Sequence, residues 1–88
     1  MVLASLADGP KHGHAILHDI ADMSGATLGP GTLYGAIARL ERDGLIEAMP
    51  RDERRQPYKL TPLGRQVLTA KLTTLQRIVR MGLRKLEA

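Results

Sequence analysis

The 88-residue sequence predicts a mainly α-helical fold with a small β-hairpin, in which a winged helix-turn-helix head is followed by a long C-terminal helix. Three short segments with helical spacing of apolar residues occupy the first 44 residues. Two strand-like segments then flank an arginine-rich loop at residues 51–56, and helical periodicity continues from there to the end. Short helices ahead of a basic hairpin are typical of the winged helix-turn-helix plan.

Turn residues bound the first two helices. The apolar stretch at residues 2–6 ends at Asp8, Gly9 and Pro10, which together form a strong helix stop. Between residues 11 and 23 the apolar positions again recur at helical spacing, at Ile16, Leu17, Ile20 and Met23. Residues 24–26 interrupt this pattern, so we expect the second helix to span about residues 11–23.

The remaining elements follow in order. Leu33, Ile37 and Leu40 stand at i, i+4 and i+7 of a third helix, and Gly44 is suited to its C-terminal cap. Residues 45–49 and 57–60 are expected to form two short strands. Thr61 and Pro62 form an N-cap and first-turn pair for a last helix that runs to about residue 86. We therefore expect a head at residues 1–61 and a dimerisation helix at residues 62–88, together in one compact unit.

Composition limits how such a chain reaches stability. A chain of this length buries only about 60–65% of its unfolded surface. The sequence has no cysteine, phenylalanine or tryptophan, so the core must be aliphatic, without disulfides or thiolate-bound zinc. These facts favour oligomerisation. No apolar run approaches the roughly 20 residues of a membrane span, and no basic flank precedes the short apolar N-terminus, so we expect a cytoplasmic protein with neither signal peptide nor membrane partner.

The charge is strongly asymmetric along the chain. Residues 1–50 carry three basic and six acidic side chains, whereas residues 51–88 carry ten basic and three acidic ones. Such an asymmetry indicates contact with an anion, of which nucleic acid is the usual example. A solvated, arginine-rich helix would produce the same asymmetry, and charge alone does not decide between the two.

The outward side of the third helix is the candidate DNA-reading surface. It carries small residues and two arginines: Gly31, Thr32, Gly35, Ala38, Arg39 and Arg42. Small side chains permit close approach to the floor of a major groove, and arginine can donate paired hydrogen bonds to guanine. The alternative is an ordinary exposed helix face, but such faces favour Lys, Glu and Gln over two glycines. Tyr34 lies at the edge of this helix, where it can either touch a phosphate or pack at the rim of the core.

The hairpin loop forms the candidate wing. Arg51, Arg54, Arg55 and Lys59 lie in or beside it, partly offset by Asp52 and Glu53. Arginines on such a loop can lie along the DNA backbone or in the minor groove. By itself the loop would be interpreted as a solvated turn with local ion pairs; beside the third helix, DNA contact is favoured.

The last helix carries a heptad-like seam. Its apolar and small positions step by four and three residues, at Leu68, Leu72, Leu75, Val79, Gly82 and Leu86, and Ile78 and Leu83 widen the stripe. A helix of roughly 37 Å is too long to pack fully on a head of this size. We expect it to pair with a second copy, with Leu3 of the first helix covering the partner's last helix. A membrane-surface helix or a different partner protein is the alternative.

No catalytic, cofactor or metal site is expected. His14, His18 and Asp22 follow one another at helical spacing, which can chelate zinc or nickel, but exposed histidine pairs of this kind are common by chance. The sequence has no cysteine nucleophile, no phosphate-cradling loop and no acid pair with an evident pocket. The sequence therefore indicates a protein that is not an enzyme.

Several motifs, in order, resemble those of PadR-type transcriptional regulators. They are the apolar first helix ending in DGP, KHGHAI at residues 11–16, GPGTLYGAIARLERDGLI at residues 29–46, and the wing and helix start RDERRQPYKLTPLGR at residues 51–65. The resemblance covers essentially the whole chain. Two positions depart from the usual pattern, since His14 replaces a tyrosine and Gly35 replaces a proline found in many members.

The resemblance implies a homodimer that binds double-stranded DNA, usually as a repressor, with its third helices in successive major grooves. It implies DNA contacts by Thr32, Tyr34 and Arg39, and backbone contacts by Arg54 and Arg55. It also implies a small-molecule effector, of unidentified structure, bound near the dimer interface. The competing function is a winged-helix protein-interaction module without DNA binding. That function calls for a large anchor side chain at the centre of the third helix, where Gly35 and Arg42 stand.

Overall fold

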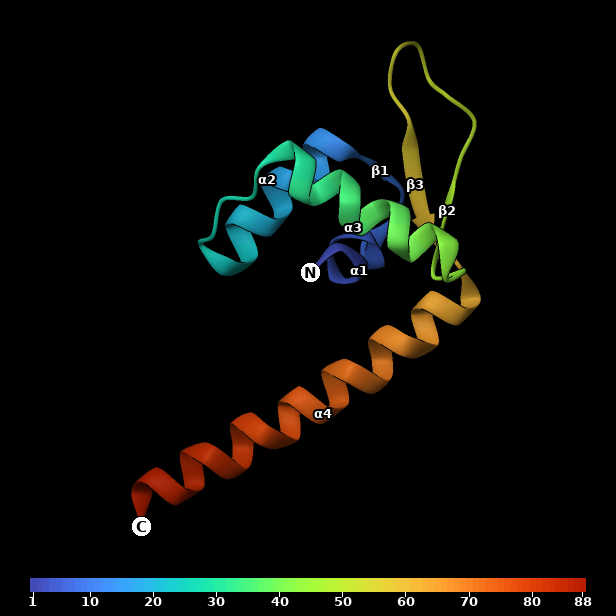
Figure 1. Ribbon diagram of the computed structural model, residues 1–88. Helices are drawn as coiled ribbons and strands as arrows, with labels where there is room; N and C mark the ends of the chain where they lie inside the picture. The colour runs from blue at the N-terminus through green and yellow to red at the C-terminus, as the bar shows by residue number, and fades with distance from the viewer.

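The computed structural model describes all 88 residues. In chain order it contains α1 (Val2–Ser5), the short 3-10 helix η1 (Leu6–Asp8), β1 (Lys11–His12), α2 (Gly13–Ser24), α3 (Pro30–Arg42), β2 (Ile46–Ala48), β3 (Pro57–Leu60) and α4 (Pro62–Glu87). The elements before α4 form a head, from which α4 extends as a long arm (Figure 1). The chain alone is elongated, with extents of 55 × 27 × 20 Å. The predicted class, helical with a small sheet and a long last helix, is confirmed.

The sheet is the first point at which the structure differs from the prediction. It has three antiparallel strands in the order β1-β3-β2, not the two of a simple hairpin. Lys11 and His12 pair with Tyr58 and Pro57 of β3, and α2 therefore begins at Gly13 instead of at Lys11. A two-residue strand has no periodicity of its own, because only its partner strand defines it. This pairing brings His12 to the base of the wing.

The core is aliphatic, as the composition predicts. The most deeply buried side chains come from every layer of the head: Leu6, Ile16, Ile20, Leu33, Ile37 and Ile46 are all at most 2% exposed. Each such side chain contributes roughly 1.5–3 kcal/mol relative to exposure. Leu33 and Ile37 are the predicted inward positions of α3, and their burial fixes which side of that helix faces solvent.

A polar cluster joins α1 to α2. The hydroxyl of Ser5, which is buried, donates to Oδ2 of Asp19 at 2.8 Å. Lys11 donates to the Ser5 carbonyl and to the Asp8 carboxylate, and its Nζ atom lies 3.4 Å from Oδ2 of Asp19. The hydrogen bond from Lys11, and then its charge, lower the pKa of Asp8; the hydrogen bond to Asp8 likewise raises the pKa of Lys11.

The start of α4 is locked to the loop after α3. The Thr61 hydroxyl accepts from the Gly64 amide at 3.0 Å and donates to the Gly44 carbonyl at 2.6 Å, which confirms the predicted N-cap. The Thr61 amide donates to the Leu45 carbonyl at 3.2 Å. At Gly64, a Cβ atom would lie only 1.9 Å from the Leu45 carbonyl oxygen, so this close approach requires glycine.

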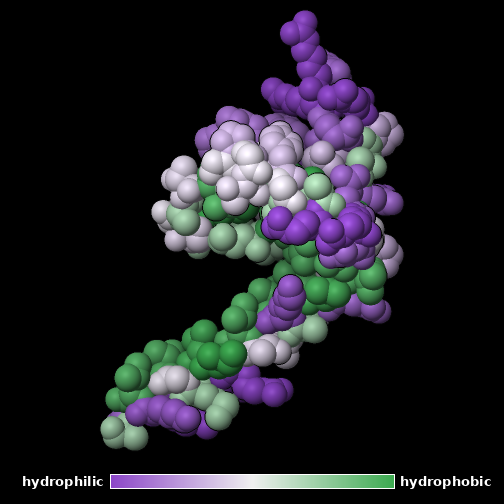
Figure 2. Space-filling view, viewed as in Figure 1, coloured by the Kyte–Doolittle hydropathy of each residue, from purple (hydrophilic) through white to green (hydrophobic).

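Beyond Leu68, α4 has no cover from the head. Every residue from 69 to 88 is exposed. Seven of these residues are large and hydrophobic: Leu72, Leu75, Ile78, Val79, Met81, Leu83 and Leu86. Figure 2 shows hydrophobic side chains following the arm, in contrast to the hydrophilic wing. No helix combines the length and the apolar character needed to cross a membrane.

Candidate nucleic-acid interface

The outward side of α3 presents the residues that the sequence singled out. Thr32, Tyr34, Ala38, Arg39 and Arg42 are exposed, and Gly35 is half-buried. Tyr34 lies at the edge of this face and the others lie opposite the buried Leu33 and Ile37, so a single helix places all of them on the surface. Pro30 at the first turn provides the fixed φ and the missing amide that suit a helix start.

Two glycines on this face have no explanation within the chain. A Cβ atom on Gly31 would meet nothing within 4 Å, and one on Gly35 would meet only the Arg39 Nη1 atom at 3.8 Å. Gly35 lies in the interior of α3, where glycine costs about 0.5–1 kcal/mol relative to alanine, whereas Gly31 lies in the first turn. No neighbouring group of the protein requires glycine at either position, and this face of α3 is open to close approach from outside.

The two arginines of α3 are held differently. Arg39 extends back along the helix, over Gly35. Arg42 donates from Nε to Oδ1 of Asp43 at 3.2 Å, and both side chains are more than half exposed. An exposed pair of this kind contributes about 0–1 kcal/mol, so Arg42 can exchange Asp43 for another anion at little cost. The sequence pattern did not predict this pair.

A tight turn displays the wing arginines. The backbones of Asp52 and Arg55 exchange two hydrogen bonds, of 3.0 and 2.9 Å, and Glu53 adopts a left-handed φ of 55°. Arg54 and Arg55 therefore project from a hairpin end. Lys59, which the sequence grouped with the wing cations, forms an exposed ion pair across the strands with Glu47 at 3.1 Å.

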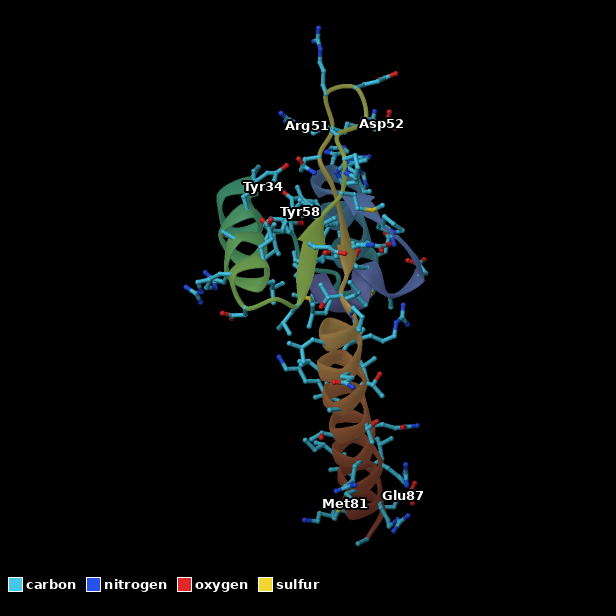
Figure 3. The ribbon with its side chains drawn as sticks, turned by 90° about the vertical axis from the view of Figure 1, so that its right-hand side faces the viewer. Tyr34, Arg51, Asp52, Tyr58, Met81 and Glu87 are labelled. Carbon is cyan, nitrogen blue, oxygen red and sulfur yellow. The ribbon has the colours of Figure 1, made fainter.

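A basic groove separates α3 from the wing. Its volume is about 620 Å³, and its lining contains three arginines and no carboxylate: His12, Gly13, His14, Tyr34, Arg51, Arg54, Arg55, Gln56 and Tyr58. In Figure 3, Tyr34 on α3 and Tyr58 on β3 lie near one another below Arg51. A Cβ atom on Gly13 would lie 2.5 Å from the Tyr34 hydroxyl, so Tyr34 packs directly on the start of α2. Burial raises the pKa of the Tyr58 hydroxyl.

His12, Gly13 and Tyr58 are groove residues that the sequence pattern did not assign to the interface. The one signal was the His12-Gly13 pair at the start of α2, but only the pairing of β1 with β3 shows that it lies beside the wing. Tyr34 packs on Gly13 and is still 51% exposed, so its position at the rim leaves contact with a phosphate a prediction.

His14 and His18 do not belong to a group of side chains that could hold a metal ion. His14 and His18 are exposed, with ring centroids 4.8 Å apart in an edge-to-face arrangement. No group of three or more histidine, aspartate or glutamate side chains is placed to hold a metal ion.

The residues predicted for the dimer seam fall into two groups. Leu3 and Leu68 are 6% and 8% exposed and belong to the core of their own head. By contrast, Leu72, Leu75, Val79 and Leu86 are 49–83% exposed on the arm. In the single chain, the part of the predicted seam that is left exposed begins at Leu72.

A helical head that exposes one helix with small residues and arginines, beside a basic β-hairpin, defines the winged helix-turn-helix class of DNA-binding protein. The comparisons with known proteins identify the group within that class. Residues 2–70 match the model of the transcriptional regulator PadR-like family. The chain belongs to this family of transcriptional regulators.

Two relatives span nearly the whole chain. Transcriptional regulator Rv3488 of Mycobacterium tuberculosis is 37% identical over 82 residues, which are 90% of this chain and 76% of the relative. An uncharacterised 37.1-kDa protein in transposon TN4556 of Streptomyces fradiae is 46% identical over 78 residues, 89% of this chain. The chain spans only 23% of the length of that Streptomyces relative.

Solved structures share the fold. A transcriptional regulator from Clostridium thermocellum superposes with a TM-score of 0.79 at 29% identity, covering 91% of this chain and 81% of the other. A PadR family regulator from Clostridium difficile gives a TM-score of 0.79 at 25% identity, with 91% and 88% covered. A PadR-like regulator from Bacillus cereus, at 15% identity, has the same fold with a TM-score of 0.88 over 99% of this chain and 88% of its own.

Proposed function

We propose that the chain is a sequence-specific DNA-binding repressor that acts as a homodimer, with α3 in the major groove and the wing along the DNA backbone. The observation that carries the proposal is the outward face of α3, where two glycines without an internal explanation lie among exposed arginines. A protein-interaction face would instead carry a large apolar anchor at its centre. The centre of this face is Gly35, Ala38 and Arg42, which supports DNA.

The bare arm supports the dimer. Seven large hydrophobic side chains beyond Leu68 are at least 49% exposed, which is unfavourable for an isolated chain in water. Gly82, in the same stripe, has nothing within 4 Å of its Cβ position, so it too lacks an internal explanation and is suited to a close helix–helix contact. At about 1.5 Å per residue the 26-residue arm is roughly 39 Å long. That length is comparable to the roughly 34–36 Å between half-sites one turn apart on DNA.

The two basic elements have different tasks in this proposal. Arg39 is exposed on α3 with its guanidinium over Gly35; in this proposal it turns to reach base edges and contributes discrimination between sequences. Arg54 and Arg55 project from the turn of the wing and neutralise phosphates, which contributes affinity for any duplex. The repressor role follows the family resemblance, as does a small-molecule effector near the dimer interface. In this proposal the effector would occupy a hollow of about 270 Å³ bounded by α1, α3 and α4, which Arg39 also lines.

The test begins by selecting bound duplexes from a randomised pool, because enrichment identifies an operator whatever its sequence is. Gel shifts with the selected and a scrambled duplex are then titrated with salt. Arg39→Ala should weaken binding to the selected duplex by about 1–3 kcal/mol and leave the scrambled one nearly unchanged. The double change Arg54→Ala and Arg55→Ala should weaken both duplexes and reduce the log–log salt slope by up to about 3.6 for a dimer, at roughly 0.9 per phosphate contact.

Three results would count against the proposal. Failure of the pool to yield any enriched sequence would remove sequence-specific binding. A wing variant that keeps the full salt slope would remove the assigned division of tasks. Transcription from a promoter containing the selected site that stays unchanged, or rises, when the protein is added in vitro would remove the repressor role.

A further inference from the structure

His12 at the edge of the basic groove has a hydrogen-bonding conflict that the protein alone does not resolve. Its Nδ1 atom accepts from the Ala15 amide at 3.4 Å and so caps α2. A ring nitrogen that accepts carries no proton, so the neutral imidazole must carry its proton on Nε2. Nε2 in turn lies 3.4 Å from Nη1 of Arg55.

In the tautomer that caps α2, both atoms of that second contact are donors. A guanidinium has five N–H groups and no acceptor, so it cannot accept from Nε2–H. If Arg55 donated to Nε2, the proton would have to move to Nδ1 and the cap of α2 would be lost. The two contacts of the ring are equally long, at 3.4 Å, so distance does not decide between them, and a neutral imidazole can accept at only one of its nitrogens. An acceptor beside both atoms would satisfy each of them and leave the cap intact.

The surroundings specify what kind of acceptor fits. The groove is lined by Arg51, Arg54 and Arg55 and by no carboxylate, which selects an anion. Two tyrosines also line it, and the hydroxyl of Tyr34 is held in place by its packing on Gly13. Tetrahedral oxyanions accept several hydrogen bonds at once, and arginine binds phosphate in a paired geometry. A phosphate group matches this set of donors.

The position of the groove favours a phosphate of DNA over a free one. It lies between α3 and the wing, the two elements that are proposed to contact the same duplex. The backbone strand that separates a major groove from the next minor groove must pass between a helix in the first and a loop on the second. A phosphate of that strand would lie opposite His12 and Arg55.

We propose that His12 and Arg55 together bind one phosphate of the DNA backbone, with Nε2–H of His12 and the Arg55 guanidinium donating to the same group. This inference rests on the proposed DNA-binding function and extends it with a residue from the start of α2. His12 then has two tasks: one ring nitrogen caps the helix and the other holds the backbone strand. The contact fixes the position of the head on the duplex and carries no sequence information.

The test uses His12→Asn, because asparagine is among the best N-cap residues yet is too short to place a donor where Nε2 lies. His18→Asn is the matched control, with the same change on an exposed position of α2 outside the groove. Gel shifts are made on the selected duplex and on a scrambled one. His12→Asn should lose about tenfold in affinity per subunit for both duplexes, whereas His18→Asn should bind like the unaltered protein. Arg55→Gln tests the same phosphate through a side chain that has no capping role.

A series of duplexes, each with one phosphate replaced by an uncharged methylphosphonate, locates the contact. We expect one position per half-site that weakens the unaltered protein by about tenfold and has little further effect on His12→Asn or Arg55→Gln.

The inference is overturned alone if the unaltered protein binds DNA and His12→Asn binds equally well, or if every replacement weakens all variants by the same factor. It is also overturned if inorganic phosphate raises the melting temperature of the unaltered protein but not of His12→Asn, while DNA binding is the same, since the groove would then hold a free anion. If the unaltered protein binds no duplex, the proposed function fails and this inference fails with it.

Discussion

Replacing Gly35 by alanine should stabilise the fold and weaken DNA binding at the same time. The position lies in the interior of α3, and an added Cβ atom would meet only Arg39 Nη1 at 3.8 Å, an ordinary van der Waals contact. The helix should therefore gain the full difference between glycine and alanine, about 0.5–1 kcal/mol per subunit. For a chain of 60–100 residues, 1 kcal/mol corresponds to roughly 4–8 °C in melting temperature.

The same methyl group should obstruct the approach of DNA. An extra methyl in a tightly packed contact costs about 1–3 kcal/mol, which is roughly 5- to 150-fold in affinity. Thermal unfolding and gel shifts on the selected duplex measure the two effects separately. Thr73→Ala is the control, because it replaces a poorer helix former on the exposed arm, away from the apolar stripe and from α3. It should raise the melting temperature without changing DNA affinity.

Two results would refute this reasoning in different places. A Gly35→Ala protein that melts at a lower temperature would show that the space around the glycine is not open. A protein that melts at a higher temperature and binds DNA as before would show that no molecule approaches α3 closely at this point.

Three further predictions concern the junction, the arm and the polar cluster. Gly64→Ala, whose Cβ would lie 1.9 Å from the Leu45 carbonyl oxygen, should lower the unfolding free energy by about 1–3 kcal/mol or more, measured by urea denaturation. Leu75→Asp should leave the secondary structure unchanged, because the side chain is 56% exposed in the single chain, and should yield monomers in sedimentation experiments; an unaltered chain that is monomeric at micromolar concentration would contradict the dimer. Lys11 lowers the pKa of Asp8, so the stability from this pair is present above pH 3.8 and is lost as the pH falls through the lowered value; Asp8→Asn should make unfolding less sensitive to pH in that acid range, and an unchanged profile would contradict the ion pair.

Local patterns in the sequence were sufficient to predict the helices and the hairpin. The spacing of Leu33 and Ile37 identified the buried side of α3, and Thr61 with Pro62 marked the start of α4, because each of these signals acts within one or two turns. The outward residues of α3 followed directly, since the buried side of a helix determines the exposed one. Their contacts with DNA stay a prediction.

The groove could not be predicted, because it depends on contacts between distant segments. His12 and Arg55 are 43 residues apart in the sequence and lie side by side only because β1 pairs with β3. Leu3 and Leu68 also show that spacing does not reveal which segments pack together. Both fit an apolar pattern that pointed to a partner chain, yet the head uses them in its own core, a choice that spacing alone does not reveal.

The junction at Thr61 has a mechanical consequence. Because Thr61, the N-cap of α4, is hydrogen-bonded to the loop that follows α3, the arm is attached directly to the end of α3. In a pair of chains joined along their arms, the angle at which the arms cross would therefore set the tilt of one α3 helix relative to the other. Which half-site spacing the pair accepts would then depend on side chains of α4 that touch no base. Substitutions in the apolar stripe could change the choice of operator without altering a single DNA contact.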